Sequence, residues 1–164
     1  MPILDPNSIE FFSKSSDQTK RLGTRLGSFL NKGDIICLSG DLGTGKTTFV
    51  QGLAKGWGSL DLVTSPTFVI INQYRKPGGE ILHHMDAYRL SGAIDAINLD
   101  MDQIISTGAL VLEWPELILS ALPQNYLWID LKWVDEFQRR MVFNGKGIHY
   151  QQLLKEFRIN SFGG

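Results

Sequence analysis

The chain has 164 residues, of which 43% are hydrophobic and 20% are charged. This length and composition are typical of one soluble globular domain and exclude a disordered or collagen-like chain. We expect residues 1–164 to form a single domain, with residues 161–164 as a mobile tail. The net charge is −1, from 16 basic and 17 acidic residues, and this balance does not indicate nucleic acid as the main ligand of the whole surface.

The charge is unevenly distributed along the chain. Residues 80–121 hold seven acidic side chains against the single base Arg89, and residues 13–32 hold five bases against Asp17. Such asymmetry suits docking to a protein partner, although a solvated face gives the same pattern. The N-terminus does not resemble a signal peptide, and no apolar stretch approaches the roughly 18 residues of a membrane span. We therefore expect a cytoplasmic protein that contacts neither membrane nor DNA.

The first part of the chain predicts strands and helices in alternation. Residues 9–12 suit a short strand, and Ser15 or Ser16 can cap a helix that continues to residue 30. Residues 34–39 form a continuous apolar run typical of a buried strand. This run contains the only cysteine, Cys37, which we expect to be a buried thiol rather than a nucleophile. After a glycine-rich turn, a further helix is expected over residues 46–57.

The middle of the chain predicts two strands and a region of short helical turns. An apolar run at residues 68–71 and a strand at residues 81–85 flank a Lys-Pro-Gly-Gly turn. The second of these strands ends at Asp86. Residues 92–105 have the pattern of short helical turns.

The C-terminal third adds a buried strand, a hairpin and a helix. The strand over residues 109–112 ends at Glu113, and Pro115 can occupy the first position of a helix that contains residues 117–119. Apolar and polar residues alternate from 127 to 133, and Met141 and Phe143 suit a second short strand, so we expect an antiparallel hairpin before the last helix. Strands that alternate with helices indicate an α/β fold, with a mostly parallel sheet flanked by helices and an antiparallel C-terminal hairpin.

Residues 40–47 read Gly-Asp-Leu-Gly-Thr-Gly-Lys-Thr and match the eight-position P-loop pattern in full. Glycines allow the backbone to turn so that successive amide groups surround a phosphate, and the following helix adds its positive N-terminal end. Lys46 can neutralise the β- and γ-phosphates, and the Thr47 hydroxyl can bind Mg²⁺. Because a buried strand precedes the loop and a helix follows it, the sequence predicts a P-loop NTPase-like fold that binds phosphate.

A P-loop site also needs a carboxylate that holds Mg²⁺ at the end of a neighbouring strand. Asp86 is the best placed carboxylate, and Glu113 is the second candidate. A glutamate beside the γ-phosphate could orient or deprotonate the attacking water, or bind Mg²⁺ through water. A surface carboxylate at a strand end gives the same pattern, so that alternative stays open for both residues.

Two short motifs are interpreted as structural. Residues 31–34 spell the guanine-reading Asn-Lys-Gly-Asp of GTPases, but they precede the P-loop, so we interpret them as the end of a helix. His83 and His84 are adjacent, and adjacent residues of a strand point to opposite faces, which makes a shared metal ion difficult. His84 lies on the same face as Asp86, and we expect it to pack there or to support the site.

Four segments together resemble one known family. They are Gly-Asp-Leu-Gly-Thr-Gly-Lys-Thr-Thr-Phe at 40–49, Ser-Pro-Thr-Phe at 65–68, His-Met-Asp-Ala-Tyr-Arg-Leu at 84–90 and Leu-Glu-Trp-Pro-Glu at 112–116. Their order and spacing are similar to those of the TsaE family, also called YjeE, which are small bacterial P-loop ATPases. The resemblance runs from about residue 13 to the last helix.

The resemblance implies a role in making threonylcarbamoyladenosine, a modified base of tRNA. A member of this family binds and hydrolyses ATP with Mg²⁺ while docked on a heterodimer of TsaD and TsaB. Its ATPase activity would be weak when it is alone. Hydrolysis would reset that complex between turnovers. Contact with tRNA would be indirect or weak.

The resemblance also implies roles for individual residues. The phosphates would be held by Gly43, Thr44, Gly45, Lys46, Thr47 and Thr48. The metal site would be formed by Thr47, Asp86 and Glu113, and the catalytic residues would be Lys46, Asp86 and Glu113.

Further residues match the family with less defined roles. Ser65 and Thr67 match a segment that behaves like a switch and senses the γ-phosphate, and Trp114 matches a tryptophan that packs or stacks near the nucleotide. Arg89 would act on phosphate or partner, or form a structural ion pair. We expect adenine contacts near Ser16 and Phe137. The stretch 91–105 departs from the family pattern, with Asn98 in place of a glycine, and this leaves the conformation of that loop open.

Two other functions are considered. Many small-molecule kinases are single P-loop domains of this size, but they close an arginine-bearing lid over both substrates. This chain has seven arginines, and Arg139 and Arg140 lie in the predicted hairpin rather than in a helical lid. The second alternative is an ATP-gated assembly factor whose hydrolysis is incidental.

Overall fold

The computed structural model describes residues 7–41, 43–63, 71–89 and 100–162. Its strands are β1 (Ser8–Ser13), β2 (Ile35–Ser39), β3 (Ile71–Arg75), β4 (Ile81–Asp86), β5 (Gly108–Glu113), β6 (Tyr126–Trp133) and β7 (Arg139–Lys146). Its helices are α1 (Ser16–Gly27), α2 (Lys46–Trp57), α4 (Met101–Thr107) and α5 (Ile148–Phe162), with 3-10 turns η1 (Ala87–Arg89), η2 (Pro115–Leu117) and η3 (Leu119–Ala121).

The seven strands form one sheet in the order β1-β7-β6-β2-β5-β4-β3. The four central strands are parallel, because β2 pairs parallel with both β5 and β6, and β4 pairs parallel with β5. Antiparallel strands complete both edges, with β3 against β4 on one side and β6, β7 and β1 on the other. The predicted α/β fold, with its parallel centre and C-terminal hairpin, is confirmed.

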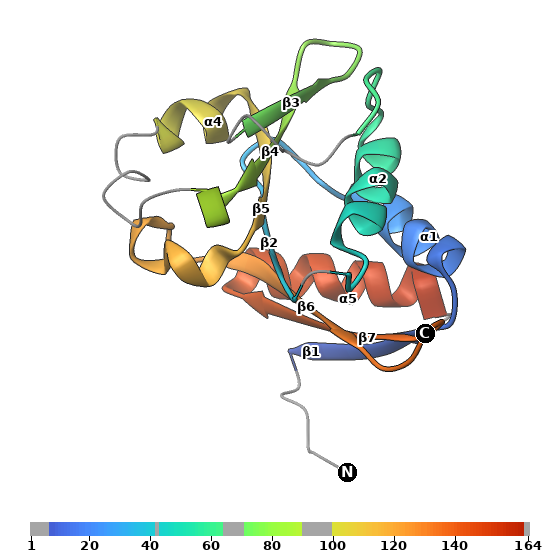
Figure 1. The fold of residues 1–164 in the computed structure, drawn as a ribbon. Coiled ribbons are helices and arrows are strands. Elements are labelled where there is room, and N and C mark those ends of the chain that lie inside the picture. The colour runs from blue at the N-terminus through green and yellow to red at the C-terminus, as the bar shows by residue number, and fades with distance from the viewer. Residues whose placement is uncertain (1–6, 42, 64–70, 90–99, 163–164) are drawn as a thin grey trace.

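Both faces of the sheet are covered. Figure 1 shows α1 and α2 side by side on one face and α4 on the other. Along β2, Ile36 and Leu38 pack with α1, α2 and α5, whereas Ile35 and Cys37 pack with α4 and the turns after β5. Two buried faces explain the continuous apolar run of this strand. Burial raises the pKa of the Cys37 thiol to about 12, as expected for a structural cysteine.

Helices α1 and α2 cross at unusually close range because glycines face each other at the contact. A Cβ atom on Gly56 would lie 1.9 Å from the carbonyl oxygen of Thr24, and one on Gly52 would lie 2.0 Å from that of Lys20. Gly23 and Gly27 on α1 meet the backbone of α2 in the same way. The two Gly-x-x-x-Gly pairs therefore place the backbone of α2 directly against α1.

Two predicted helices differ from the structure. Helix α1 ends at Gly27 rather than at residue 30, because Phe29 and Leu30 donate to carbonyls three residues back in a tighter turn. The expected helix after Pro115 is replaced by η2 and η3, which are separated at Ile118, where φ is −133°. This value departs from helical geometry and interrupts the helix at a buried side chain.

The last helix is longer than predicted. It continues to Phe162 and so includes two of the four residues expected in the tail. Arg25 on α1 donates to the carbonyls of Asn160 (3.4 Å) and Ser161 (3.1 Å), which satisfies acceptors that a helix end leaves unpaired. Of the strand expected at 68–71, residues 68–70 lie outside the described residues. Of the helical turns expected at 92–105, residues 92–99 lie outside them, and α4 begins in the described part.

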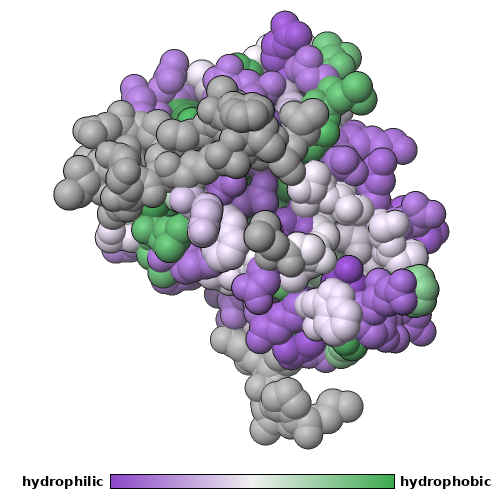
Figure 2. Space-filling model, in the orientation of Figure 1, coloured by the Kyte–Doolittle hydropathy of each residue, from purple (hydrophilic) through white to green (hydrophobic). Residues whose placement is uncertain are grey.

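The described surface is mixed in character. Figure 2 shows hydrophilic residues over much of the visible face, with hydrophobic residues in separate small groups. Within the described ranges, no helix combines the length and the apolar character needed to cross a bilayer.

Candidate functional site

The glycine-rich loop connects the end of β2 to the start of α2, as the motif requires. At Gly40, a Cβ atom would lie 2.5 Å from the carbonyl oxygen of Leu131, so only glycine allows the loop to leave β2 beside β6. At Gly45, φ is +99°, a left-handed conformation that glycine adopts without strain. The Thr44 hydroxyl closes the loop by donating to the carbonyl of Asp41 at 2.8 Å.

The N-terminus of α2 is suited to an anion. Helix α1 is capped by Ser15, whose side chain accepts from the amide of Gln18 at 3.1 Å. The corresponding residue of α2, Gly45, has no side chain with which to cap. The amides of the first turn, where Thr47 and Thr48 lie, therefore face a position that a phosphate can fill, and the helix dipole favours negative charge there.

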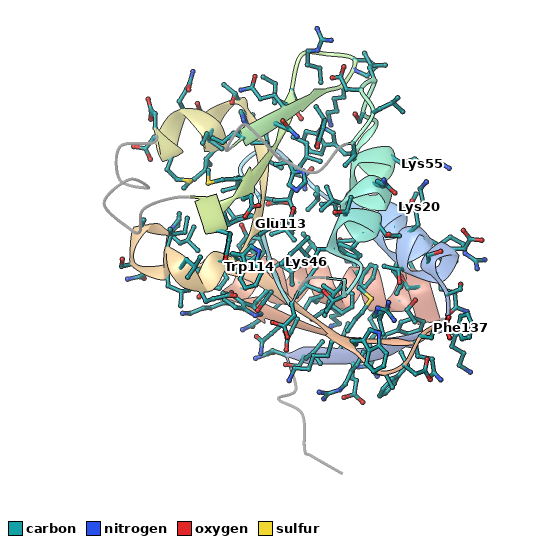
Figure 3. The ribbon with its side chains drawn as sticks, viewed as in Figure 1. Lys20, Lys46, Lys55, Glu113, Trp114 and Phe137 are labelled. Carbon is teal, nitrogen blue, oxygen red and sulfur yellow. The ribbon has the colours of Figure 1, made fainter. Side chains whose placement is uncertain are left out.

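Lys46 projects from the first turn of α2 and is 6% exposed. Its Nζ donates to the carbonyl of Gly40 and lies 4.2 Å from the centroid of the Trp114 ring. Burial lowers the pKa of Lys46, and the carboxylates of Glu113 and Asp86 oppose this shift. Figure 3 shows Lys46, Glu113 and Trp114 gathered at the same end of the sheet.

The two predicted carboxylates lie on adjacent strands. Asp86 at the end of β4 is the direct register partner of Glu113 at the end of β5, and Glu113 is in turn the register partner of Leu38 on β2. Glu113 therefore lies one strand from the P-loop and Asp86 two strands. Asp86 Oδ1 accepts from the amide of Tyr88 at 3.0 Å, and Glu113 is 7% exposed. Their roles as metal or catalytic residues stay predictions.

His84 and its neighbour His83 diverge, as expected for adjacent residues of a strand. His83 Nε2 is 2.9 Å from the hydroxyl of Thr107 on α4. His84 faces the opposite side, where its Nε2 lies 2.6 Å from Glu113 Oε2 and its Nδ1 lies 2.9 Å from the hydroxyl of Tyr74. The contact with Tyr74 was not expected from the sequence, because it depends on how β3 pairs with β4.

Trp114 adopts an unusual backbone conformation next to Glu113. Its φ is +57°, and it is the one non-glycine residue with a left-handed conformation in the described ranges. The ring lies against Lys46 Nζ and stands 5.2 Å from the ring of Tyr88, centroid to centroid. Strain of this kind concentrates at functional sites. The structure therefore places the expected tryptophan at the P-loop lysine, and its role toward a nucleotide stays a prediction.

Arg139 is a residue of the site that sequence reasoning missed. It lies at the start of β7, and its Nη2 donates to the carbonyl of Gly43 in the P-loop at 3.3 Å. Its Nη1 donates to the carbonyls of Asp135 (2.7 Å) and Gln138 (3.0 Å) in the hairpin turn. The guanidinium thus ties the β6–β7 turn to the P-loop. Only its position after a strand-turn pattern could have indicated this contact.

Arg139→Gln is expected to weaken the affinity for ATP. Without its hydrogen bond to Gly43, the P-loop is less ordered before ATP binds. Loss of one hydrogen bond from a charged donor costs about 1.5 kcal/mol, or roughly tenfold in affinity. Calorimetric titration with ATP measures the change. Arg140→Gln is the matched control, because Arg140 Nε donates instead to Oε2 of Glu10 on β1, at 2.7 Å. Equal affinities for the two variants would contradict the prediction.

A cavity of about 560 Å³ opens beside the P-loop, between Gly40 and Thr44 on one side and Trp114 and Trp133 on the other. Carboxylates of Asp41, Glu116 and Asp130 also line it. Because carboxylates repel phosphate, this cavity does not suit the phosphates of a nucleotide. The amides at the start of α2 are the better phosphate site.

The oxygen donors present fit Mg²⁺ rather than a metal held by protein alone. In the described ranges, no group of three or more His, Cys, Asp or Glu converges on one point. Mg²⁺ typically takes one or two carboxylates and completes its shell with water and substrate phosphates. The Thr47 hydroxyl and the Asp86 carboxylate are donors of this type. Ser65 and Thr67, the expected switch, lie outside the described residues.

The elements expected near adenine flank the P-loop. Thr19, in the first turn of α1 after Ser16, lies close to Gly45, since a Cβ atom there would be 3.9 Å from Thr19 Cγ2. Phe137 is 70% exposed in the β6–β7 turn, which Arg139 joins to the loop. Adenine contacts stay a prediction. Arg89 lies in η1, and its side chain is outside the described part of the structure, so its role stays a prediction.

The buried strand, the glycine loop, the uncapped helix and the adjacent carboxylates define a P-loop protein. A family model described as "Threonylcarbamoyl adenosine biosynthesis protein TsaE" matches residues 13–141. The chain belongs to this TsaE family.

Individual relatives agree with the family match. A protein of Bacillus subtilis (strain 168) named tRNA threonylcarbamoyladenosine biosynthesis protein TsaE is 38% identical over 140 residues, which cover 85% of this chain and 87% of that protein. A protein of the same name from Streptomyces coelicolor is 46% identical over 110 residues, covering 66% and 74%. The crystal structure of Bacillus subtilis YdiB matches with a TM-score of 0.79 and 32% identity, over 93% of this chain and 95% of that one.

Proposed function

We propose that this protein is a Mg²⁺-dependent ATPase of tRNA threonylcarbamoyladenosine biosynthesis. It binds and hydrolyses ATP while docked on a TsaD–TsaB pair in the cytoplasm, resets that pair between turnovers, and contacts tRNA only indirectly or weakly. Family membership supports the pathway. The observation that carries the ATPase activity is the pairing of Glu113 with Asp86 at adjacent strand ends, one and two strands from the P-loop.

Binding uses the backbone and one buried cation. The amides of residues 43–48 surround the β- and γ-phosphates, where the uncapped N-terminus of α2 favours negative charge. Lys46 exchanges the Gly40 carbonyl and the Trp114 ring for phosphate oxygens. Because the side chain is buried, its attraction for phosphate is stronger than it would be in water.

Hydrolysis requires a proton acceptor beside the γ-phosphate. Glu113 accepts a proton from water while the water oxygen attacks the γ-phosphorus and the bond to the departing ADP oxygen breaks. The Thr47 hydroxyl and the Asp86 carboxylate would hold Mg²⁺, and Glu113 would contact the ion through water. When bound, the ion neutralises charge on the phosphates.

Glu113→Ala is expected to retain ATP binding and to lose hydrolysis. General-base catalysis contributes about 10²–10⁴-fold, so the rate of phosphate release should fall by that amount. The measurement is Mg²⁺-dependent ATP hydrolysis by the chain with and without a TsaD–TsaB pair, together with multi-turnover modification of tRNA. Asp102→Ala is the control, because Asp102 is an exposed acid on α4, away from the P-loop.

The outcomes separate the functions. Stimulation of the wild-type protein by the pair, lost in Glu113→Ala, supports the proposal. Normal multi-turnover modification by Glu113→Ala would contradict the catalytic role and favour an assembly factor whose hydrolysis is incidental. Phosphate transfer to an added metabolite, with no response to the pair, would favour a small-molecule kinase.

A further inference from the structure

Glu113 is held by a buried chain of side chains from three adjacent strands. His84 on β4 lies between Tyr74 on β3 and Glu113 on β5, at 2.9 Å from the hydroxyl of the first and 2.6 Å from the carboxylate of the second. Tyr74 is 3% exposed, His84 0% and Glu113 7%. In the strand registers, each partner is the diagonal neighbour of His84, a spacing that long side chains can bridge.

The chemistry of the groups assigns the protons along this chain. A carboxylate can only accept hydrogen bonds, so the hydrogen between His84 and Glu113 belongs to Nε2. In the neutral ring, Nδ1 then carries a lone pair, and the hydroxyl of Tyr74 donates to it. Each of the three buried side chains is therefore paired, and Tyr74 favours the tautomer that Glu113 needs.

A second charge competes for Glu113. Of the nearby carboxylates, Glu113 does most to raise the pKa of Lys46, whose ammonium donates to Gly40 and lies over the Trp114 ring. Without another partner, the carboxylate would be drawn to this buried cation, because opposite charges attract strongly where water is excluded. A direct ion pair between Lys46 and Glu113 would keep Lys46 from the phosphates and Glu113 from the attacking water.

We propose that His84 is a positioning residue for Glu113. Its Nε2–H holds Oε2, keeps the carboxylate turned away from Lys46 and leaves Oε1 for the attacking water, while Tyr74 maintains the tautomer. This role rests on the proposed hydrolysis of ATP by Glu113. It adds two residues, from β3 and β4, to the machinery that the P-loop and Asp86 already define.

Two amide variants of His84 test the position of the donor. The side-chain nitrogen of Gln reaches the place of imidazole Nε2, whereas that of Asn reaches the place of Nδ1. We expect His84→Asn to lower kcat by about 10–100-fold, the range for loss of an outer partner of a functional group. The Kd for ATP, measured by calorimetry on each variant, should stay at the wild-type value. His84→Gln should recover most of kcat.

A structural role alone would give a different result. Both variants remove the imidazole ring from a buried position, so similar decreases in Tm are expected for the two. If kcat falls equally in both, or follows Tm rather than the donor position, the positioning role is overturned. If the wild-type chain with the TsaD–TsaB pair does not hydrolyse ATP at all, the proposed function fails, and the role of His84 toward it fails as well.

The proton assignment has its own test in the nucleotide-free protein. The chain has three histidines, and ¹⁵N NMR of the rings, with His84→Gln to identify the signal, reports the tautomer. We expect His84 as the Nε2–H tautomer, and Tyr74→Phe should increase exchange between tautomers. An Nδ1–H tautomer in the wild-type protein would overturn the inference whatever the activity shows.

Discussion

Lys46→Met is expected to abolish stabilisation by ATP without destabilising the nucleotide-free protein. A ligand at 100 times its Kd stabilises a protein by about 2.7 kcal/mol. This gain should disappear when the lysine proposed to bind the phosphates is replaced. The nucleotide-free fold should be at least as stable as wild type, because Lys46 is buried and charged.

The expected stability of the nucleotide-free variant depends on the pKa of Lys46, which burial lowers in the folded state. A lysine that binds its proton less tightly when folded than when unfolded makes folding less favourable at pH values below its folded pKa. Methionine has a similar length and carries no charge, so it removes this cost. Stability lost to the charge is regained as pH rises toward the unfolded pKa.

Thermal unfolding at neutral pH, with and without MgATP, measures both effects. Lys55→Met is the matched control, because Lys55 is an exposed lysine on the same helix and points away from the site (Figure 3). It should retain the ATP-induced rise in Tm. A nucleotide-free Lys46→Met protein that melts well below wild type would contradict the argument, since the contacts with Gly40 and Trp114 would then outweigh the cost of burial.

The P-loop and the central strands could be predicted because their signals are local. Residues 40–47 are contiguous, and the apolar runs of β2 and β5 identify strands buried on both faces. The position of Glu113 beside Asp86 follows once both strands are parallel and end at the same edge. Sequence reasoning therefore predicted the positions of the P-loop and of both carboxylates in the fold, and their roles stay predictions.

What could not be predicted depends on register and on distant contacts. Tyr74 reaches His84 only because β3 returns antiparallel against β4, and Arg139 reaches Gly43 across 96 positions of sequence. The positive φ of Trp114 and the break at Ile118 turned an expected helix into two short turns. These features arise from tertiary packing, which residue patterns within one segment do not encode.

The glycine pairs of α1 and α2 lead to the second large expected effect. Helix propensity predicts that Gly56→Ala stabilises a helix interior by about 1 kcal/mol. The structure predicts the opposite, because the new Cβ would lie 1.9 Å from the carbonyl oxygen of Thr24 and 2.7 Å from its carbonyl carbon. Both are backbone atoms, so the helices must separate. We expect a loss of about 3 kcal/mol, the upper end of the range for overpacking.

Urea unfolding of Gly56→Ala, compared with Lys55→Ala, tests this expectation, because Lys55 lies on the exposed side of the same turn. Separation of the helices would also move α2, whose first turn carries Lys46 and the amides proposed to bind phosphate. The affinity for ATP should therefore fall together with stability in Gly56→Ala and remain unchanged in Lys55→Ala. A more stable Gly56→Ala protein would mean that the helices do not approach this closely, and that propensity rather than packing governs the position.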